Sequence, residues 1–157
     1  NFLTEHGISS YGELESKLTA VSARRDTAHA EIKRIESRSA ELALVMKHAG
    51  TYRQLKPLYE RYRKSNDKEK FLRGHESEII LFEAAARELK RLGTVPLPTT
   101  ESMKTELANL NAEKERLLAE YKAARAEAQE YETVKQNVDA LLTVAKEQEQ
   151  QRRHELE

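Results

Sequence analysis

Residues 14–49 read LESKLTAVSARRDTAHAEIKRIESRSAELALVMKHA, and apolar residues recur in this stretch at alternating intervals of four and three positions. A mean spacing of 3.5 residues keeps one apolar stripe on a single side of a helix, where it faces a partner helix. Nine of the eleven stripe positions are apolar. The stripe consists of Leu14, Leu18, Val21, Arg25, Ala28, Ile32, Ile35, Ser39, Leu42, Met46 and Ala49. The stretch therefore predicts one long helix that packs against another.

The same rhythm returns in residues 103–145, where eleven of thirteen stripe positions are apolar. This second stripe consists of Met103, Leu107, Leu110, Lys114, Leu117, Tyr121, Ala124, Ala128, Tyr131, Lys135, Val138, Leu142 and Ala145. No stretch alternates with a period of two for long enough to predict a strand. The chain is therefore expected to be all-α, an elongated antiparallel helical hairpin (coiled coil) with a short-helix tip.

Antiparallel pairing keeps the two stripes in contact when the numbers of facing residues sum to 142, 149 or 156. A sum of 149 places Ala28 opposite Tyr121 and Arg25 opposite Ala124, so that large side chains face small ones. A sum of 156 places Ala28 opposite Ala128 and leaves a gap, which a close-packed interior disfavours. We therefore expect the register with a sum of 149.

Capping residues, glycines and prolines predict where the helices begin and end. Ser10 with Glu13 forms a capping box for a helix that starts near Tyr11. The stripe slips by one position at Gly50, and Pro57 follows, so a kink is expected there.

Later polar residues cap the remaining helices. Asn66 with Glu69 is expected to cap a third helical segment, and Thr99 or Thr100 caps the last helix. The predicted organisation is an N-terminal connector (1–10), a first arm (11–49), a helical tip (50–92) that contains a kinked helix and a helix over 67–92, a proline-containing loop (93–99), and a second arm (100–157) with a fraying C-terminus.

Composition limits the class of protein. Of the 157 residues, 38% are hydrophobic and only three are Phe, so the stripes themselves must supply the core. The chain has no cysteine, which rules out disulfides and thiolate metal sites and fits a cytoplasmic protein. No apolar run approaches the length of a membrane span, so membrane insertion is not expected. A start at Asn1 suggests a piece of a longer polypeptide.

Basic and aromatic residues are interleaved between residues 51 and 75, where eight basic and three acidic residues give a net charge of +5. Such a combination can bind a phosphate backbone and stack on unpaired bases. The alternative is that the aromatic residues form a small core and the cations are its solvated face. The candidate DNA-binding residues are Arg53, Lys56, Arg61, Arg63, Lys64, Lys68, Lys70, Arg73, Tyr52, Tyr59 and Tyr62, with Phe71 as a further aromatic.

Other chemistry is poorly supported by the sequence. The five histidines are scattered, and the stretch from His75 to Ile79 begins like the zinc motif HExxH but lacks its second histidine. His75 is better interpreted as part of the apolar face of the third helix. We expect no catalytic residue, no metal site and no cofactor in this chain.

Four segments together resemble a known family. They are NFLTEHGISSYGELESKL (1–18), TYRQLKPLYERYRKS (51–65), FLRGHESEIILFEAAARELKRLG (71–93) and YETVKQNVDALL (131–142). They resemble the C-terminal region of relaxases, the mobilization nucleases of plasmids and integrative conjugative elements in Gram-positive bacteria. In that family a histidine cluster and a nucleophilic tyrosine lie in an N-terminal nicking domain, and neither is found here.

The resemblance implies an accessory, non-catalytic module of a DNA-transfer enzyme and favours contact between the basic tip and DNA. Contact with conjugation or relaxosome proteins and formation of a homodimer are equally compatible with it. A purely structural coiled coil that mediates dimerisation or spacing is the alternative.

Overall fold

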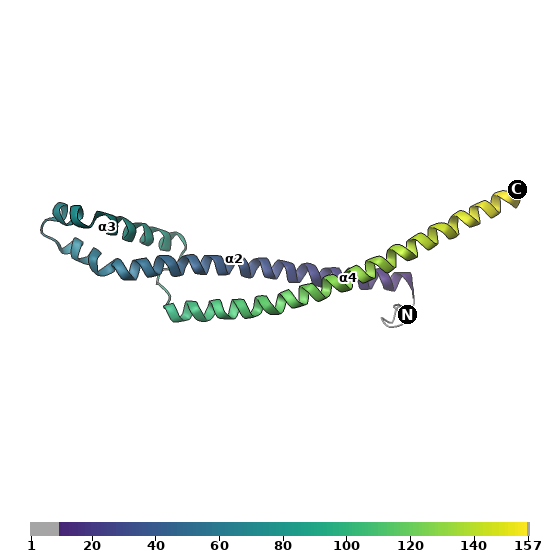
Figure 1. The fold of residues 1–157 in the computed structure, drawn as a ribbon, viewed down its shortest axis with the longest axis horizontal. Coiled ribbons are helices and arrows are strands. Elements are labelled where there is room, and N and C mark those ends of the chain that lie inside the picture. Colours follow the sequence, from purple (N-terminus) through teal and green to yellow (C-terminus); the bar gives the residue numbers. More distant parts are fainter. Residues whose placement is uncertain (1–9, 157) are drawn as a thin grey trace. The chain divides into compact units, whose positions relative to one another are not determined.

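The computed structural model describes residues 10–156, which form three helices (Figure 1). They are α2 (Tyr11–Lys64), α3 (Lys68–Arg91) and α4 (Thr100–Leu156). Residues 10–156 contain no strand, so the predicted all-α fold is confirmed. The expected connector over residues 1–9 lies outside the described residues.

Helix α2 begins at the predicted cap, because Ser10 Oγ accepts a hydrogen bond from the Glu13 backbone N–H at 3.2 Å. It then continues through Gly50 and Pro57 to Lys64. No helix end therefore lies at the boundary expected between residues 49 and 50. A proline removes one intrahelical hydrogen bond, and the packing of Tyr52 and Tyr59, on either side of Pro57, against Phe82 helps to offset that loss.

Helix α3 is capped by Asp67, whose carboxylate accepts from the Lys70 N–H at 3.1 Å. The prediction of Asn66 as the cap was wrong by one residue. Ser65 explains the difference, because its Oγ accepts from the Asp67 N–H at 3.3 Å and orients that residue. Within α3 the backbone at His75 departs from helical geometry, with φ −136° and ψ 24°.

Gly93 ends α3 with a φ of 71°, and its N–H donates to the Lys90 carbonyl at 3.1 Å. A cis peptide bond joins Val95 to Pro96 in the segment that follows. Thr99 is the cap of α4, as expected, since its Oγ1 accepts from the Ser102 N–H at 3.1 Å. Helix α4 runs to Leu156. The fraying expected of its last residues stays a prediction.

The chain divides into two compact units. Unit 1 combines residues 11–33 of α2 with residues 114–156 of α4, which run antiparallel. Three cross-helix contacts define this pairing, namely Tyr11 with Asp139, Arg24 with Glu127 and His29 with Tyr121. Their residue numbers sum to 150 or 151, closer to the expected 149 than to 142 or 156. The buried residues of unit 1 are Leu14, Val21, Ala28, Ile32, Leu117, Ala124, Ala128 and Tyr131.

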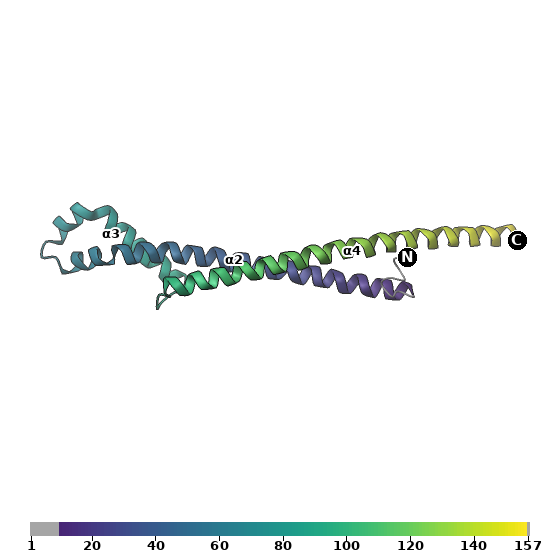
Figure 2. The same cartoon turned by 60° about the horizontal axis from the view of Figure 1, so that its bottom comes forward.

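Unit 2 comprises residues 34–113, with α3 lying beside the second half of α2 (Figure 2). The first residues of α4 also belong to it and are held by Arg38, which binds Glu106. Its buried residues are Ile35, Leu42, Val45, Ala49, Ile79, Phe82, Ala85, Leu89, Met103 and Leu110. This unit contains every candidate DNA-binding residue.

The apolar stripes are buried as predicted with two exceptions. Every stripe position of α2 is buried or half-buried, and so is every position of the α4 stripe from Met103 to Val138. Leu142 and Ala145 are exposed. Helix α2 begins at Tyr11, which meets Asp139, so no described part of α2 lies opposite the end of the α4 stripe.

Candidate nucleic-acid interface

Stacked aromatic rings join α2 to α3 in unit 2. Phe82 of α3 is buried between two rings of α2, with centroid distances of 4.9 Å to Tyr52 and 4.3 Å to Tyr59. Both pairs are nearly parallel, with interplanar angles of 23° and 24°. Parallel aromatic pairs at these separations contribute packing energy beyond the area they bury. Phe82 therefore fixes α3 against α2.

The ring contacts continue toward the turn between the helices. Tyr62 lies 5.9 Å from Tyr59 and 6.0 Å from Phe71, and Phe71 lies 4.6 Å from His75. We refer to these six residues as the ring series, which consists of Tyr52, Phe82, Tyr59, Tyr62, Phe71 and His75. The three candidate tyrosines thus pack on neighbouring rings and form the small core of the tip.

Arg53 differs from the other candidate cations. Its guanidinium donates to Thr100 Oγ1 at 2.8 Å and to the Pro98 carbonyl. Both acceptors lie where the proline-containing segment enters α4. Arg53 therefore connects α2 to the start of α4, and its guanidinium is already engaged by these two acceptors.

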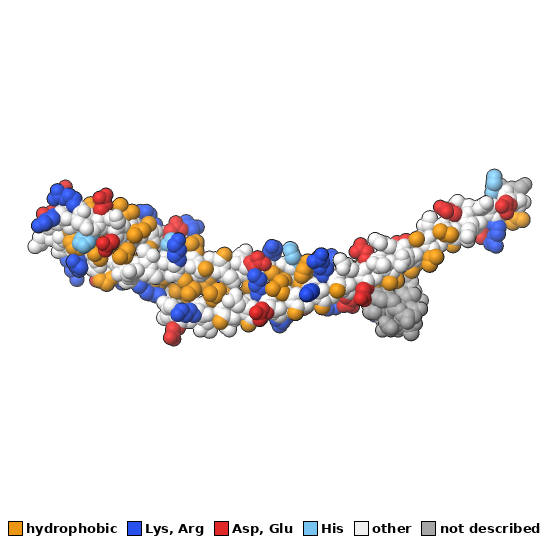
Figure 3. Space-filling model, viewed as in Figure 1, with side chains coloured by type: hydrophobic (Ala, Val, Ile, Leu, Met, Phe, Trp, Pro, Cys, Tyr) orange, Lys and Arg blue, Asp and Glu red, His pale blue; other side chains and the backbone are white. Residues whose placement is uncertain are grey.

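The other seven candidate cations are exposed and lie near the turn between α2 and α3. We call them the basic tip, which consists of Lys56, Arg61, Arg63, Lys64, Lys68, Lys70 and Arg73. Among residues 10–156, none of the seven has a carboxylate within ion-pair distance. Figure 3 shows Lys and Arg side chains gathered at this end of unit 2.

Two members of the basic tip lie over rings of the ring series. The Lys56 ammonium is 5.7 Å from the centroid of Tyr52, and the Arg61 guanidinium carbon is 5.6 Å from that of Phe71. Such cation–π contacts orient a side chain without neutralising its charge.

Elsewhere in the described residues most arginines pair with carboxylates. Arg24, Arg34, Arg38 and Arg116 each have a glutamate within 4.0 Å. Among residues 10–156, the lysines outside the tip, Arg87 and Arg125 also lack a carboxylate within this distance, so the distinctive property of the basic tip is that seven such cations lie close together. This grouping concentrates a positive potential there.

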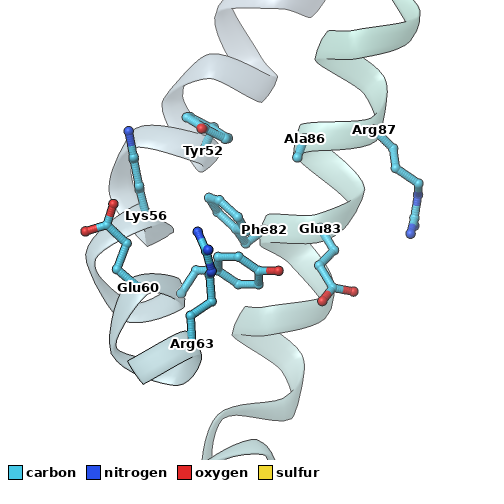
Figure 4. Close-up of a pocket in the computed structure, with 9 residues that line it drawn as sticks. Tyr52, Lys56, Glu60, Arg63, Phe82, Glu83, Ala86 and Arg87 are labelled. Carbon is cyan, nitrogen blue, oxygen red and sulfur yellow. The ribbon is translucent and has the colours of Figure 1, made fainter. Parts of the chain in front are cut away.

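A hollow of about 430 Å³ opens beside the ring series between α2 and α3 (Figure 4). Arg63 extends from α2 into this hollow toward Phe82, whereas Arg87 points away from it. Glu60 and Glu83 also line the hollow. The sequence placed Arg63 and Tyr59 in one basic and aromatic stretch but did not bring Phe82 to them.

The histidines of residues 10–156 form no common site. His75 is half-buried on the ring series, as its position on the α3 stripe predicted, and its Nδ1 lies 3.7 Å from Glu78 Oε1. In the described part of the chain, no three His, Asp or Glu side chains converge in a way that could hold a metal ion. Over the same residues, no helix has the length and apolar character required to cross a membrane.

Comparisons with protein-family models, with curated protein sequences and with solved structures found no match to this chain. The site is therefore interpreted from its own geometry and charge.

Proposed function

We propose that the chain is a non-catalytic helical module of a DNA-mobilization relaxase and that the basic tip binds DNA. The observation that carries this proposal is the set of seven exposed cations without a carboxylate partner among the described residues. Protein cations without a carboxylate partner favour binding to a polyanion, because they release the counterions condensed on it. DNA is the polyanion that a relaxase handles, so the resemblance and the charge distribution agree.

The ring series supports this function indirectly. It holds the end of α2 against the start of α3, so that cations from both helices are presented together. A surface whose cations are already in place loses less conformational entropy on binding than a flexible basic segment. We propose that the module acts in the cytoplasm by aiding DNA association or contact with the conjugative transfer machinery.

Charge reversal at the basic tip tests the proposal. The variant Arg61→Glu, Arg63→Glu, Lys64→Glu is compared with Lys104→Glu, Lys122→Glu, Arg125→Glu, which makes the same change in net charge at other exposed positions. Binding of a fluorescent duplex is measured by anisotropy at about 50 and 200 mM salt. We expect the tip variant to lose binding, the control to retain it, and both to keep their helicity by circular dichroism.

Two results would contradict the proposal. Salt-independent binding, or none, by the unaltered chain would remove the electrostatic basis for DNA contact. Equal losses in the two triple variants would show that net charge, and not the basic tip, determines binding.

A structural coiled coil that mediates dimerisation is the second candidate, and one observation favours it. Leu141, Leu142 and Val144 of α4 are 70%, 49% and 49% exposed, which leaves an apolar strip beyond the described start of α2. Exposed apolar strips of this kind occur at interfaces between proteins. Light scattering of the unaltered chain and of the variant Leu141→Lys, Leu142→Lys tests this. A dimer that the variant reduces to a monomer would support dimerisation through α4.

A further inference from the structure

We infer that the basic tip recognises the phosphodiester backbone of duplex DNA and does not stack unpaired bases. This inference rests on the proposed function and specifies the form of DNA that the site takes. It follows from the way in which the rings and the cations of the tip are used within unit 2.

The central ring of the ring series, Phe82, is already covered on both faces. Phe82 is stacked on both sides, by Tyr52 at 4.9 Å and by Tyr59 at 4.3 Å. Proteins that bind single strands offer ring faces on which successive bases stack. A base that entered this part of the tip would have to displace one ring of the protein from another.

The rings nearer the turn are also occupied. Phe71 contacts Tyr62 at 6.0 Å and His75 at 4.6 Å, and the Arg61 guanidinium lies over it. At the other end of the ring series, Tyr52 carries the Lys56 ammonium. The rings of the series thus pack on one another, with Phe82 buried and the other five half-buried.

The remaining recognition chemistry is charge. Duplex DNA carries one negative charge per about 1.7 Å of its axis, a higher density than an unstacked single strand offers. Without a stacking surface, a group of cations is expected to bind the duplex more tightly than the single strand, because the duplex has the higher charge density. The contact with DNA phosphates is assigned to Arg63 and Lys64, and it does not depend on base identity. Arg63 extends into the hollow beside Phe82, and Lys64 lies at the end of α2.

The test compares the binding of four nucleic-acid probes of equal length to the unaltered chain. They are a duplex, one of its strands, the same strand with alternating abasic sites, and the same strand with 2-aminopurine, whose fluorescence falls when it stacks on a ring. We expect the duplex to bind about fivefold or more tightly than the strand at about 50 mM salt. The abasic strand should match the intact strand within about twofold, and 2-aminopurine fluorescence should not fall on binding.

Substitutions of Arg63 give a second readout. Arg63→Lys keeps the charge and should keep duplex affinity within about twofold, whereas Arg63→Gln should reduce the slope of log affinity against log salt by about one. Both changes are at an exposed position, so the fold is retained.

The outcomes separate the two proposals. Tighter binding of the single strand, a loss on removing its bases, or quenching of 2-aminopurine would overturn this inference while DNA binding by the tip stands. Absence of binding to all four probes would overturn the proposed function itself.

Discussion

Arg38 binds Glu106 through two hydrogen bonds, from Nε to Oε1 at 2.7 Å and from Nη2 to Oε2 at 3.1 Å. The pair joins α2 to the start of α4 within unit 2. The hydrogen bond from Arg38 lowers the pKa of Glu106 below its ordinary value, and the same bond raises the pKa of Arg38. Two-point pairing of this kind fixes orientation as well as charge.

Glu106→Gln should therefore lower the free energy of unfolding at pH 7 by about 0.5–1 kcal/mol, a small value because both side chains are 40% exposed. Since the pKa is lowered in the folded state, this stabilisation is present above about pH 4.5 and is lost as the pH falls through the folded pKa. Urea unfolding of both proteins at pH 7 and pH 3 measures it. Glu115→Gln, at an exposed position, serves as the control. A deficit of the same size at both pH values would argue against the pairing.

Tyr11 donates a hydrogen bond from its hydroxyl to Asp139, which raises the pKa of Tyr11 to about 12. Because the folded pKa is raised, the stabilisation is complete below pH 10.0, the ordinary value, and is lost as the pH rises through about 12. We expect the difference between the ultraviolet titrations of the unaltered chain and Tyr11→Phe to have its midpoint near 12. Asp139→Asn should move that midpoint down toward 10.0.

Two glycines of unit 2 should respond in opposite directions to alanine. Gly50 lies inside α2 with no atom within 4 Å of an added Cβ, so Gly50→Ala should stabilise by about 0.5–1 kcal/mol. Gly93 has a φ of +71°, so Gly93→Ala should destabilise by about 1 kcal/mol through backbone strain. Thermal unfolding followed by circular dichroism measures both. Equal shifts of the same sign would contradict the backbone argument.

Arg53 and Arg63 should separate stability from DNA affinity. Arg53→Ala removes the hydrogen bonds to Thr100 and Pro98, so it should lower the free energy of unfolding by about 1–2 kcal/mol. Its effect on duplex affinity should be smaller than that of Arg63→Ala. Arg63→Ala should weaken DNA binding and leave stability within about 0.5 kcal/mol. Urea unfolding measures stability, and anisotropy on the same preparations measures duplex affinity. A larger loss of affinity in Arg53→Ala than in Arg63→Ala would contradict the prediction.

The helices and most of the core were predictable because one physical rule, the 3.5-residue period, determines both. That rule does not tell where a partner helix begins, and for this reason Leu142 and Ala145 were wrongly expected to be buried. The cap of α3 was missed for a different reason. Asn66 and Asp67 are both good capping residues, and only the geometry of the turn selects Asp67.

The candidate site was predictable in part. Counting charges located the basic residues, but carboxylates distant in sequence could have neutralised them, and only the structure gives their distances. Arg53 shows this limit, since its acceptors lie more than forty positions along the chain. Phe82 shows it for the aromatic residues, because stacking on Tyr52 and Tyr59 depends on how α3 folds back.

The turn beside the basic tip is an expected cleavage site for trypsin. Lys64 ends α2 and Lys68 begins α3, and the three residues between them are not helical. Proteases cut most readily where an exposed backbone is free of regular structure, so early tryptic cuts are expected here and after Arg91, which precedes the non-helical residues 92–99. Bound DNA would cover the same lysines. The rate of the cut after Lys64, relative to the cut after Arg91, therefore reports occupancy of the tip without a label on either molecule.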